Sequence, residues 1–495
     1  MTVLDDIVTH ATRRPHEPAV VGPDGELTYG ELLARVDRLA GALAGLGVGP
    51  ERVCAVAVEH GIDAVVGMAA VLRAGGAFLT LDVEQPVARL TDMVRSGRAE
   101  FLLTTAALAG RLPLGGPTVL VDDPAPAKAA APVRPDPRSL AYVSHTSGST
   151  GSPNAVLVEH RGFDAYLRTL VRDCGLGQDT VTVQLAPLGY DASIRDVFAT
   201  LLAGGRLVVL SRATLMRPAE LGAAVRRFGV DTILSVTPSF LTFLVRDGSG
   251  PAWLGDMRLV ASSGESLRPL LAAGGRGLVG GRLVNQYGPT EATMTSTRFD
   301  VPTDPDTTVD KIGVPNEGVT AHVLDEALRL VPDGEVGEVY LGGAGVARGY
   351  HGRPGETAAR FLADPFGAPG ARMYRTGDLA RRLPDGTLEY LGRIDRQLKI
   401  RGYRVDPAEI EGRLLAHPAV TGAVVTAAYD ERGRAFLTAH VTGHLAELGD
   451  AALRAHLART LPHHMMPRRF ARLDQLPTTR TGKADRATLT LGGDR

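Results

Sequence analysis

Short apolar runs alternate with amphipathic segments through the first half of the chain. Val53–Val58 reads as a buried strand, Ile62–Arg73 has helical spacing, and Ala77–Leu81 is again strand-like. The same alternation returns at Val181–Leu185, Ser193–Leu202 and Arg206–Leu210, and in the predicted strands Thr232–Val236 and Leu259–Ser262. Strands that alternate with helices form parallel sheets covered on both faces, and ligands bind beyond the carboxyl ends of such strands. We therefore expect an α/β fold.

The pattern changes towards the C-terminus. Gly-bounded runs such as Gly337–Leu341 and Thr387–Leu391 predict a smaller antiparallel unit. A boundary is expected near residues 392–395. Beyond it the pattern predicts a helix, two strands and a second helix, over Pro407–Ala416, Thr421–Ala428, Ala435–Thr442 and Ala451–Leu461. The remaining chain of about 100 residues is long enough for an independent α+β domain. The Pro- and Ala-rich segment 113–137 is expected to be an exposed connection.

Composition narrows the class of protein. A chain of 495 residues is too long for one hydrophobic core, so two or more domains are expected. The net charge of −1 gives no electrostatic basis for binding nucleic acid or an anionic membrane. No apolar run approaches the ~20 residues of a membrane span, and residues 1–6 lack a signal-peptide pattern. The two cysteines, Cys54 and Cys174, have no metal-type spacing, so we expect a cytoplasmic protein without zinc.

Lysine is scarce in this chain. Only Lys128, Lys311, Lys399 and Lys483 occur among 54 basic residues, and all the others are arginine. Lysine is a mobile point charge and arginine a planar fork, so the two are not equivalent in a site. Each lysine is therefore a candidate for a specific role.

One short run carries a possible phosphate site. Thr146-Ser147-Gly148-Ser149-Thr150-Gly151 follows the apolar run Leu140–Val143, and it contains only hydroxyl residues and glycine. Backbone N–H groups and hydroxyls exposed together suit a polyphosphate, whereas a flexible Ser/Gly loop explains the run equally well. The run is not a Walker loop, because no GxxxxGK[ST] opens directly into a helix.

A set of ordered motifs decides between these alternatives. With the Ser/Thr/Gly run, the chain resembles the adenylate-forming superfamily of acyl-CoA ligases, luciferases and peptide-synthetase adenylation domains. It is most similar to a stand-alone adenylation domain that activates amino acids. The other motifs that carry the resemblance are the segments 27–32 (LTYGEL), 72–77 (LRAGGA), 190–193 (YDAS), 285–291 (NQYGPTE), 345–350 (GVARGY), 374–379 (YRTGDL), 392–402 (GRIDRQLKIRG) and 482–486 (GKADR).

The resemblance implies a fold and a division into domains. It implies a large N-terminal domain of two parallel-type α/β subdomains with a small β-barrel-like subdomain, and a small mobile C-terminal α+β domain. Residues 1–394 would form the adenylation core, and 395–495 would form a lid hinged at Asp395. One orientation of the lid would bring Lys483 to ATP, and the other would bring the segment around Lys399 to the nucleotide site for thioester formation. A helix-cap or surface role is the alternative for Asp395.

The resemblance also implies ATP and Mg²⁺ as cofactors. Glu291 would hold Mg²⁺, Asp378 the ribose hydroxyls, and Lys483, Thr290 and Lys399 would be catalytic. Solvated or turn positions are the plainer alternatives for Lys483, Asp378 and Arg393. The implied nucleotide-binding residues are Thr146, Ser147, Gly148, Ser149, Thr150, Gly151, Gly264, Glu265, Tyr287, Gly288, Thr290, Asp378 and Arg393.

The implied substrate pocket favours an amine. Asp191 stands where amino-acid-activating members place the carboxylate that pairs with the substrate ammonium, although an N-cap role is the alternative. Arg195 would pair with an acidic or carbonyl group or turn to solvent. Most of the pocket residues are polar, which favours a small or polar α-amino acid and leaves a β-amino acid open. The implied pocket residues are Asp191, Ala192, Arg195, Ser235, Ala261, Ser263, Gln286, Met294 and Thr295.

One position departs from the family pattern. Pro153-Asn154-Ala155 stands where a Pro-Lys-Gly is usual, so a lysine near the leaving phosphates is missing. The expected function is ATP-dependent amino-acid activation followed by transfer to the phosphopantetheine thiol of a separate carrier protein. The competing functions are an acyl- or aryl-CoA ligase of the same fold, and a catalytically weak homologue that acts as a binding protein.

Overall fold

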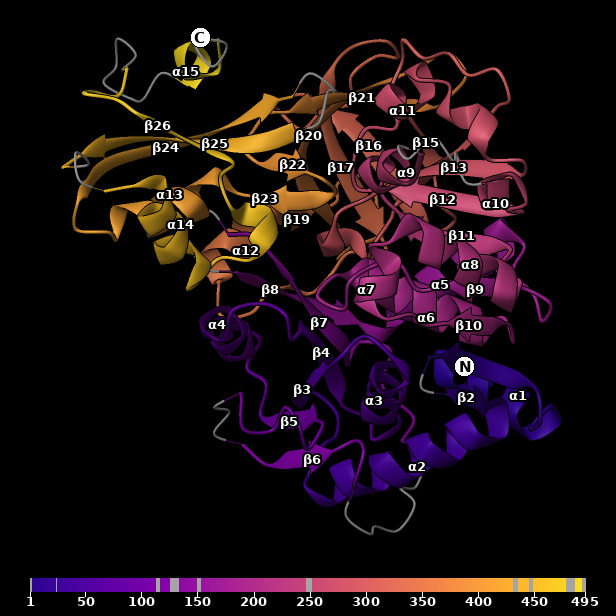
Figure 1. The fold of residues 1–495 in the computed structure, drawn as a ribbon. Coiled ribbons are helices and arrows are strands. Elements are labelled where there is room, and N and C mark those ends of the chain that lie inside the picture. The colour runs from indigo at the N-terminus through magenta and orange to yellow at the C-terminus, as the bar shows by residue number, and fades with distance from the viewer. Residues whose placement is uncertain are drawn as a thin grey trace.

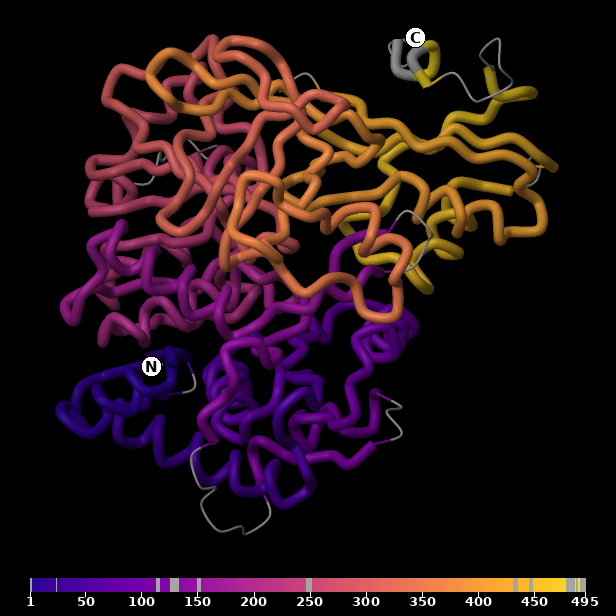
Figure 2. The backbone as a smooth tube through the Cα atoms, turned by 180° about the vertical axis from the view of Figure 1, so that it is seen from behind, coloured from indigo at the N-terminus to yellow at the C-terminus, as the bar shows by residue number. Residues whose placement is uncertain are grey.

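The computed structural model describes residues 2–23, 25–112, 116–124, 133–148, 153–245, 252–430, 435–444, 448–477 and 486–491. Figure 1 shows a large N-terminal domain, coloured indigo to orange, and a smaller C-terminal domain at its upper left. Seen from behind in Figure 2, the C-terminal domain projects from one side of the molecule and contacts it along one edge. Within the described ranges, no helix is both long and apolar enough to cross a bilayer.

The larger sheet joins a parallel half to an antiparallel half. Its parallel half runs from β13 to β1, and every pairing from β13 towards β16 is antiparallel. Its strands in spatial order are β16 (Val319–Leu324), β17 (Gly337–Gly343), β20 (Arg372–Arg382), β21 (Leu388–Arg393), β15 (Lys311–Pro315), β14 (Thr297–Val301), β13 (Arg282–Tyr287), β12 (Leu259–Ser263), β11 (Thr232–Val236), β9 (Val181–Val183), β10 (Arg206–Val208), β1 (Pro18–Gly22) and β2 (Gly25–Thr28), with β19 (Phe361–Ala363) beside β20.

The smaller sheet is parallel except at one edge. There β7 pairs with β8, and β8 with β18, in antiparallel fashion. Its strands in spatial order are β18 (Gly349–Tyr350), β8 (Asn154–Glu159), β7 (Leu140–Thr146), β4 (Ala77–Asp82), β3 (Val53–Val58), β5 (Phe101–Thr104) and β6 (Thr118–Leu120). All six residues of β3 are buried, as expected for a central strand covered on both faces.

The main core lies between the two sheets. One apolar cluster takes side chains from a face of each sheet and from α1 (Val3–Arg13), α2 (Tyr29–Gly45), α3 (Ile62–Arg73), α5 (His160–Cys174) and α6 (Asp191–Leu202). A second cluster covers the other face of the larger sheet with α7 (Arg212–Leu215), α8 (Pro218–Phe228), α9 (Pro238–Val245), α10 (Ala252–Gly255) and α11 (Arg268–Ala272). On the smaller sheet, α4 (Val87–Gly97) covers the outer face. The layered α/β architecture is confirmed.

Local sequence explains where key helices begin. The Thr28 side chain caps α2, and the Thr28 backbone N–H donates to the Glu31 carboxylate over 2.8 Å, which completes a capping box. The motif at residues 27–32, one of those that carry the family resemblance, therefore serves to begin helix α2. In α1 the pair Thr2 and Asp5 forms the same motif.

The C-terminal domain contains its own small core. The strands β24 (Val420–Tyr429), β25 (Ala435–Gly443) and β26 (Arg469–Arg472) form a sheet against α13 (Pro407–Leu415) and α14 (Asp450–Ala458), with α15 (Arg486–Leu491) beside β24. A hairpin of β22 (Leu398–Ile400) and β23 (Tyr403–Val405) precedes α13. The predicted α+β class of this domain is confirmed.

Two sequence predictions need correction. The small antiparallel unit is not a barrel: its strands extend the larger sheet, which stays open from β16 to β2. The Pro- and Ala-rich segment is not wholly an exposed connection, because Thr118–Leu120 pairs with β5 as an edge strand and Val119 and Val121 are buried. An edge strand of three residues gives too short an apolar pattern to stand out among prolines.

Candidate active site

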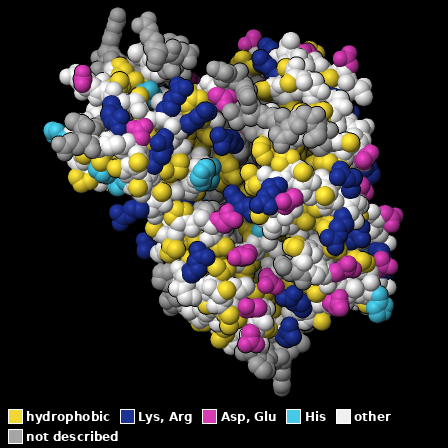
Figure 3. All heavy atoms as spheres, viewed as in Figure 1, with side chains coloured by type: hydrophobic (Ala, Val, Ile, Leu, Met, Phe, Trp, Pro, Cys, Tyr) yellow, Lys and Arg dark blue, Asp and Glu magenta, His cyan; other side chains and the backbone are white. Residues whose placement is uncertain are grey.

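A cleft of about 1610 Å³ separates the two domains. Its floor is formed where the parallel strands β4, β7, β9, β11, β12 and β13 end, which is where parallel sheets bind ligands. Figure 3 shows dark-blue Lys and Arg side chains gathered on the C-terminal lobe and along the groove beneath it. The cleft therefore combines strand ends with a positively charged cover.

A network of buried charges marks the predicted ribose end. Asp378 is buried on β20, and it accepts hydrogen bonds from the Tyr287 hydroxyl over 2.6 Å and from Arg393 Nη1 over 2.6 Å. Arg393 also donates through Nε and Nη2 to both oxygens of Asp395, each over 2.7 Å. Asp378 is thus no surface turn residue, and Arg393 is no solvated hinge residue. The structure brings together Tyr287, Asp378 and Arg393, three of the predicted nucleotide-binding residues.

Close backbone packing holds the motif around Tyr287. A Cβ at Gly288 would lie 2.6 Å from the Thr295 Cα, so only glycine fits there without a shift. Beyond it the 3₁₀ helix η2 (Thr290–Ala292) carries Thr290 into the cleft and buries Glu291 completely. Thr293 and Met294 then adopt left-handed backbone at φ 58° and 68°. Two consecutive non-glycine residues in that region indicate a loop whose shape its surroundings enforce.

Glu291, the predicted Mg²⁺ ligand, already has a cation beside it. Arg404 Nη1 lies 3.0 Å and 3.2 Å from the two Glu291 carboxylate oxygens, and the Tyr350 hydroxyl donates to one of them over 2.8 Å. Burial tends to raise the pKa of Glu291, but Arg404 and Tyr350 outweigh it and lower the pKa. In the described part of the chain, no three His, Cys, Asp or Glu side chains gather as metal ligands. The Glu291 carboxylate is one oxygen-donor group of the kind that Mg²⁺ binds together with nucleotide phosphates, and in this structure Arg404 contacts both of its oxygens.

The predicted phosphate loop is described in part. Thr146 ends β7, and buried Ser147 donates its hydroxyl to the Arg404 carbonyl over 3.0 Å. Ser149, Thr150 and Gly151 lie outside the described residues, while Gly148 is the last described residue before them. Asn154, which replaces the usual lysine, is buried opposite Thr146 in the β7–β8 ladder. It supplies no positive charge to the loop.

Two opposite charges on one helix face the predicted substrate pocket. Asp191 is the first residue of α6, whose N-cap is Tyr190, so the N-cap alternative for Asp191 is wrong. Its Oδ2 is buried and has no hydrogen-bond partner among the described residues. Burial raises the pKa of Asp191, while a hydrogen bond with Thr290 and the charge of Arg195 act against that rise. A carboxylate left half-satisfied inside a cleft is a site for an incoming cation.

Arg195 lies one turn further along α6 and points inward. It is 1% exposed, so the solvent-facing alternative is wrong. Its Nε donates to Ser235 over 2.8 Å and its Nη1 to Gln286 over 2.8 Å, with longer contacts to Tyr166 and Ser263. Within the described ranges no carboxylate lies at ion-pair distance from this guanidinium. The hydrogen bonds of this guanidinium thus go only to neutral oxygens, while the charges of Asp196 and Asp191 act on it from beyond ion-pair distance.

The other predicted pocket residues mostly line the same cleft. Ala192, Ser235, Ser263, Met294 and Thr295 line it with Asp191 and Arg195. Gln286 lies behind Arg195, and Ala261 is buried in the main core. Tyr166 on α5 was missed: its hydroxyl lies 2.9 Å from Thr295 Oγ1 and contacts Arg195. No sequence motif surrounds Tyr166, so only the packing of α5 against α6 reveals it.

The C-terminal domain closes the cleft with the β22–β23 hairpin. Lys399 Nζ lies 5.8 Å from the centre of the Tyr287 ring and 5.1 Å from that of Tyr390. Burial lowers the pKa of Lys399, and the nearby charge of Asp378 opposes that shift. In the described orientation, Lys399 therefore lies beside Tyr287, a residue of the predicted nucleotide site. Lys483 lies outside the described residues.

Further contacts join this hairpin to the N-terminal domain. Glu265, a predicted nucleotide-site residue, accepts hydrogen bonds from the Ser239 and Gly402 backbone N–H groups, over 2.9 Å and 2.5 Å. Gly264 has φ 92° and lies against Gly402, since a Cβ there would be 3.4 Å from the Gly402 carbonyl oxygen. These two residues thus contact the lid in this orientation.

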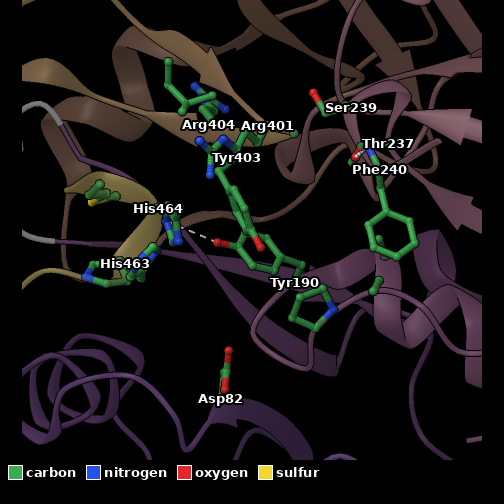
Figure 4. Close-up of a pocket in the computed structure, with 18 of the residues that line it drawn as sticks. Asp82, Tyr190, Thr237, Ser239, Phe240, Arg401, Tyr403, Arg404, His463 and His464 are labelled. Atoms are coloured by element: carbon green, nitrogen blue, oxygen red, sulfur yellow. Dashed lines mark hydrogen bonds between the residues drawn. The ribbon is translucent and has the colours of Figure 1, made fainter. Parts of the chain in front are cut away.

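An aromatic cluster seals the other side of the hairpin. Tyr403 stacks on His464 at 4.1 Å between ring centres, and Tyr190 lies 5.0 Å from Tyr403. Figure 4 shows the three side chains facing one another, with the Tyr190–His464 contact dashed. Burial lowers the pKa of His464 to about 3, so the ring is neutral. Buried Arg89 and Glu409 form a further contact between the domains, an ion pair of 2.5 Å.

Comparison with known proteins agrees with this arrangement. The AMP-binding enzyme family matches residues 7–351, and the AMP-binding enzyme C-terminal domain matches residues 409–483. The chain belongs to the AMP-binding enzyme family. Phosphinothricin tripeptide synthetase PhsC of Streptomyces viridochromogenes is 42% identical over 98% of this chain and 44% of its own length. Bacitracin synthase 3 of Bacillus licheniformis is 38% identical over 97% of this chain and 8% of its own length.

Solved structures show the same fold. An artificially fused adenylation–PCP didomain from Klebsiella oxytoca gives a TM-score of 0.86 at 24% identity, covering 96% of this chain and 94% of its own. An NRPS protein containing adenylation and PCP domains, bound to a vinylsulfonamide inhibitor, gives 0.85 at 29% identity, covering 99% and 84%. By family and by similarity, the chain is thus of the adenylate-forming type found in the adenylation domains of peptide synthetases. The chain spans less than half the length of the curated relatives named above.

Proposed function

We propose that this chain activates an amino acid with ATP and passes it to the phosphopantetheine thiol of a carrier protein. A carboxylate oxygen of the amino acid attacks the α-phosphorus of ATP, the bond to the β-phosphate oxygen breaks, and pyrophosphate leaves. The thiol then attacks the aminoacyl carbonyl, so that a thioester forms and AMP leaves. Bound Mg²⁺ would neutralise phosphate charge during the first step.

One observation carries the choice of an amino acid. Asp191 presents a buried oxygen without a partner among the described residues, next to Thr290 at the junction of the two predicted subsites. A substrate ammonium would complete that carboxylate, whereas a fatty or aryl acid would leave it buried and unpaired at a cost of several kcal/mol. This argument disfavours an acyl- or aryl-CoA ligase.

The environment of Arg195 indicates which class of side chain the substrate has. Its guanidinium is buried at the pocket floor among neutral oxygens, without a carboxylate partner in the described part of the chain. A side-chain carboxylate or carbonyl of the substrate would supply that partner, and a bidentate bond to a carboxylate is the strongest of these choices. We propose a short α-amino acid with an acidic or amide side chain.

Substrate-dependent pyrophosphate exchange tests this function. A panel of aspartate, glutamate, asparagine, glutamine, alanine, leucine, β-alanine, a fatty acid and an aryl acid separates the alternatives. We expect exchange with an acidic or amide amino acid at least tenfold above leucine, since a charged hydrogen bond is worth about 1.5–3 kcal/mol. Exchange only with fatty or aryl acids contradicts the proposal, and exchange with none supports the weak homologue that Asn154 suggests.

Two variants test whether Asp191 and Arg195 cause the substrate preference measured by pyrophosphate exchange. Asp191→Asn should weaken amino-acid use by at least tenfold without changing the response to ATP concentration. Arg195→Leu should remove the preference for acidic or amide side chains. Thioester formation on a phosphopantetheinylated carrier tests the second half-reaction, and the expected separate carrier protein stays a prediction.

A further inference from the structure

The β22–β23 hairpin carries two cations on one face. Lys399 and Arg404 are direct partners in this antiparallel ladder, so their side chains project on the same side. Lys399 lies against Tyr287 and Tyr390, near Asp378, and Arg404 reaches Glu291. The hairpin thus delivers one cation to each of the two carboxylates proposed to hold ribose and Mg²⁺.

Arg404 is held firmly in this position. Its Nε donates to Gln397 over 2.6 Å, its carbonyl accepts from the Ser147 hydroxyl over 3.0 Å, and its Nη1 contacts both Glu291 oxygens. The guanidinium is thus bound to Gln397 and to Glu291, the predicted metal ligand, and the backbone of Arg404 is bound to Ser147 of the predicted phosphate loop. The orientation of the C-terminal domain and the position of this charge are therefore coupled.

Electrostatics allow the buried Glu291 carboxylate one cationic partner at a time. Its carboxylate is fully buried, and a buried carboxylate needs a positive partner. A divalent ion beside Arg404 would place two cations within a few ångströms in a low-dielectric site, where like charges repel strongly. Among the described residues, no group of three or more His, Cys, Asp or Glu side chains that could hold a metal ion includes Glu291.

We propose that Arg404 and Mg²⁺ alternate as the counter-ion of Glu291. This proposal rests on the proposed role of Glu291 as a metal ligand. It means that the C-terminal domain cannot keep the described orientation while Mg²⁺ and nucleotide are bound at Glu291. When Mg²⁺ departs with pyrophosphate, Glu291 becomes available, and the hairpin enters with Arg404 on Glu291 and Lys399 near Asp378. Loss of the metal thereby drives the change to the thioester-forming orientation. Arg404 is a positioning residue in this scheme.

A distance measurement between the domains tests the proposal. Dyes can be placed on Arg95→Cys in α4 and Tyr429→Cys in β24, because both side chains are at least 70% exposed. The native Cys54 and Cys174 are buried, so labelling is confined to the introduced sites. Energy transfer is then recorded while Mg²⁺ is added to the full chain saturated with a non-hydrolysable ATP analogue, without amino acid.

The expected results are specific. In the native chain, Mg²⁺ should reduce the population of the described orientation, and EDTA should restore it. Arg404→Ala should reduce that population in metal-free protein by about tenfold and lower the Mg²⁺ midpoint by a similar factor, because linkage is reciprocal. Arg404→Lys should restore part of both effects. Arg401→Ala, which removes an exposed cation from the same hairpin, should behave like the native chain.

Two outcomes overturn the proposal. One is an orientation of the native chain that does not respond to Mg²⁺, and the other is an Arg404→Ala protein with the native population and midpoint. Direct titration with Mn²⁺ by electron paramagnetic resonance gives a second measure of the midpoint if dye labelling disturbs the fold. None of these measurements needs an amino acid. If the protein shows no pyrophosphate exchange but its domain orientation responds to Mg²⁺ as expected, the proposed function is contradicted. The present inference is not contradicted by that result.

Discussion

Asp378 and Arg393 lie directly opposite each other in the β20–β21 ladder and form an ion pair of 2.6 Å. The same guanidinium holds both oxygens of Asp395, the predicted hinge residue. The predicted ribose ligand and the predicted hinge are thus joined through one side chain. A ribose hydroxyl that donates a hydrogen bond to an Asp378 oxygen would compete with Arg393 for that oxygen. It would thereby change the contacts between Arg393 and Asp395, the predicted hinge residue.

Replacing Asp378 should weaken use of ATP. In Asp378→Asn the side chain loses its charge and one acceptor, so kcat/KM for ATP should fall by about 10–100-fold, the scale of one or two charged hydrogen bonds. Pyrophosphate exchange at varied ATP concentration measures this. Asp385→Asn, in the exposed turn between β20 and β21, is the matched control. An unchanged kcat/KM in Asp378→Asn would exclude the ribose role.

Lys483 should act in the first half-reaction. Lys483→Ala should slow adenylation by ~10²–10³, as expected for the loss of one transition-state donor. Pyrophosphate exchange measures adenylation, and transfer from preformed aminoacyl adenylate to a carrier measures the second step. A near-native exchange rate in Lys483→Ala would refute the role. Lys128→Ala is the matched control, since it also removes one of the few lysines.

Lys399 should act in the second half-reaction. It lies at the predicted nucleotide site in the described orientation, beside the rings of Tyr287 and Tyr390. Lys399→Ala should therefore slow thioester formation by at least tenfold while adenylation changes less than threefold. The two half-reactions are measured separately, as for Lys483. Equal losses in both steps would remove the distinction between the two lysines.

Rotation at Asp395 can be restricted chemically. Asp395→Pro fixes φ near −65°, so it should impair thioester formation more than adenylation. The substitution also removes the carboxylate that Arg393 binds, and Asp395→Ala measures that loss alone. If the proline and alanine variants lose both half-reactions to the same extent, the hinge role of this residue is wrong.

Stability should depend on the protonation of Asp164. Burial raises the pKa of this carboxyl from 3.8 to about 6, against a hydrogen bond from the Val3 backbone N–H. The unfolded chain releases the proton at lower pH than the folded chain, so the free energy of unfolding falls between pH 4 and pH 6 and stays lower above that. Asp164→Asn keeps an acceptor for Val3 and removes this loss.

The measurement for Asp164 is urea unfolding at several pH values. At pH 8 the Asp164→Asn protein should be more stable than the native chain by about 2 kcal/mol, and the difference should shrink towards pH 4. Asp306→Asn, at an exposed carboxyl held by Thr308, is a control that should not reproduce this gain. A stability difference that is the same at pH 4 and pH 8 would contradict the raised pKa.

Much of the fold follows from local pattern. Ile62–Arg73 and Thr232–Val236 have the bounds that the periodicity predicts, because an amphipathic or wholly apolar run specifies both its element and its buried face. The edge strand at Thr118 and the open path of the larger sheet were not predicted. Both depend on pairing between strands far apart in the chain, which leaves little trace in local sequence.

The sequence by itself determined the residue types of the site: the lone lysines, Asp191 on its helix, Glu291 after a Gly-Pro turn, and Asp378. Only the tertiary structure decided which way Arg195 points, that Tyr166 supports it, and that Arg404 of the lid occupies Glu291. The physical reason is distance along the chain. Arg404 and Glu291 are 113 residues apart, and their pairing depends on how two separately folded cores dock. No local pattern records that docking, because its contacts join residues of two different cores that lie far apart in the chain.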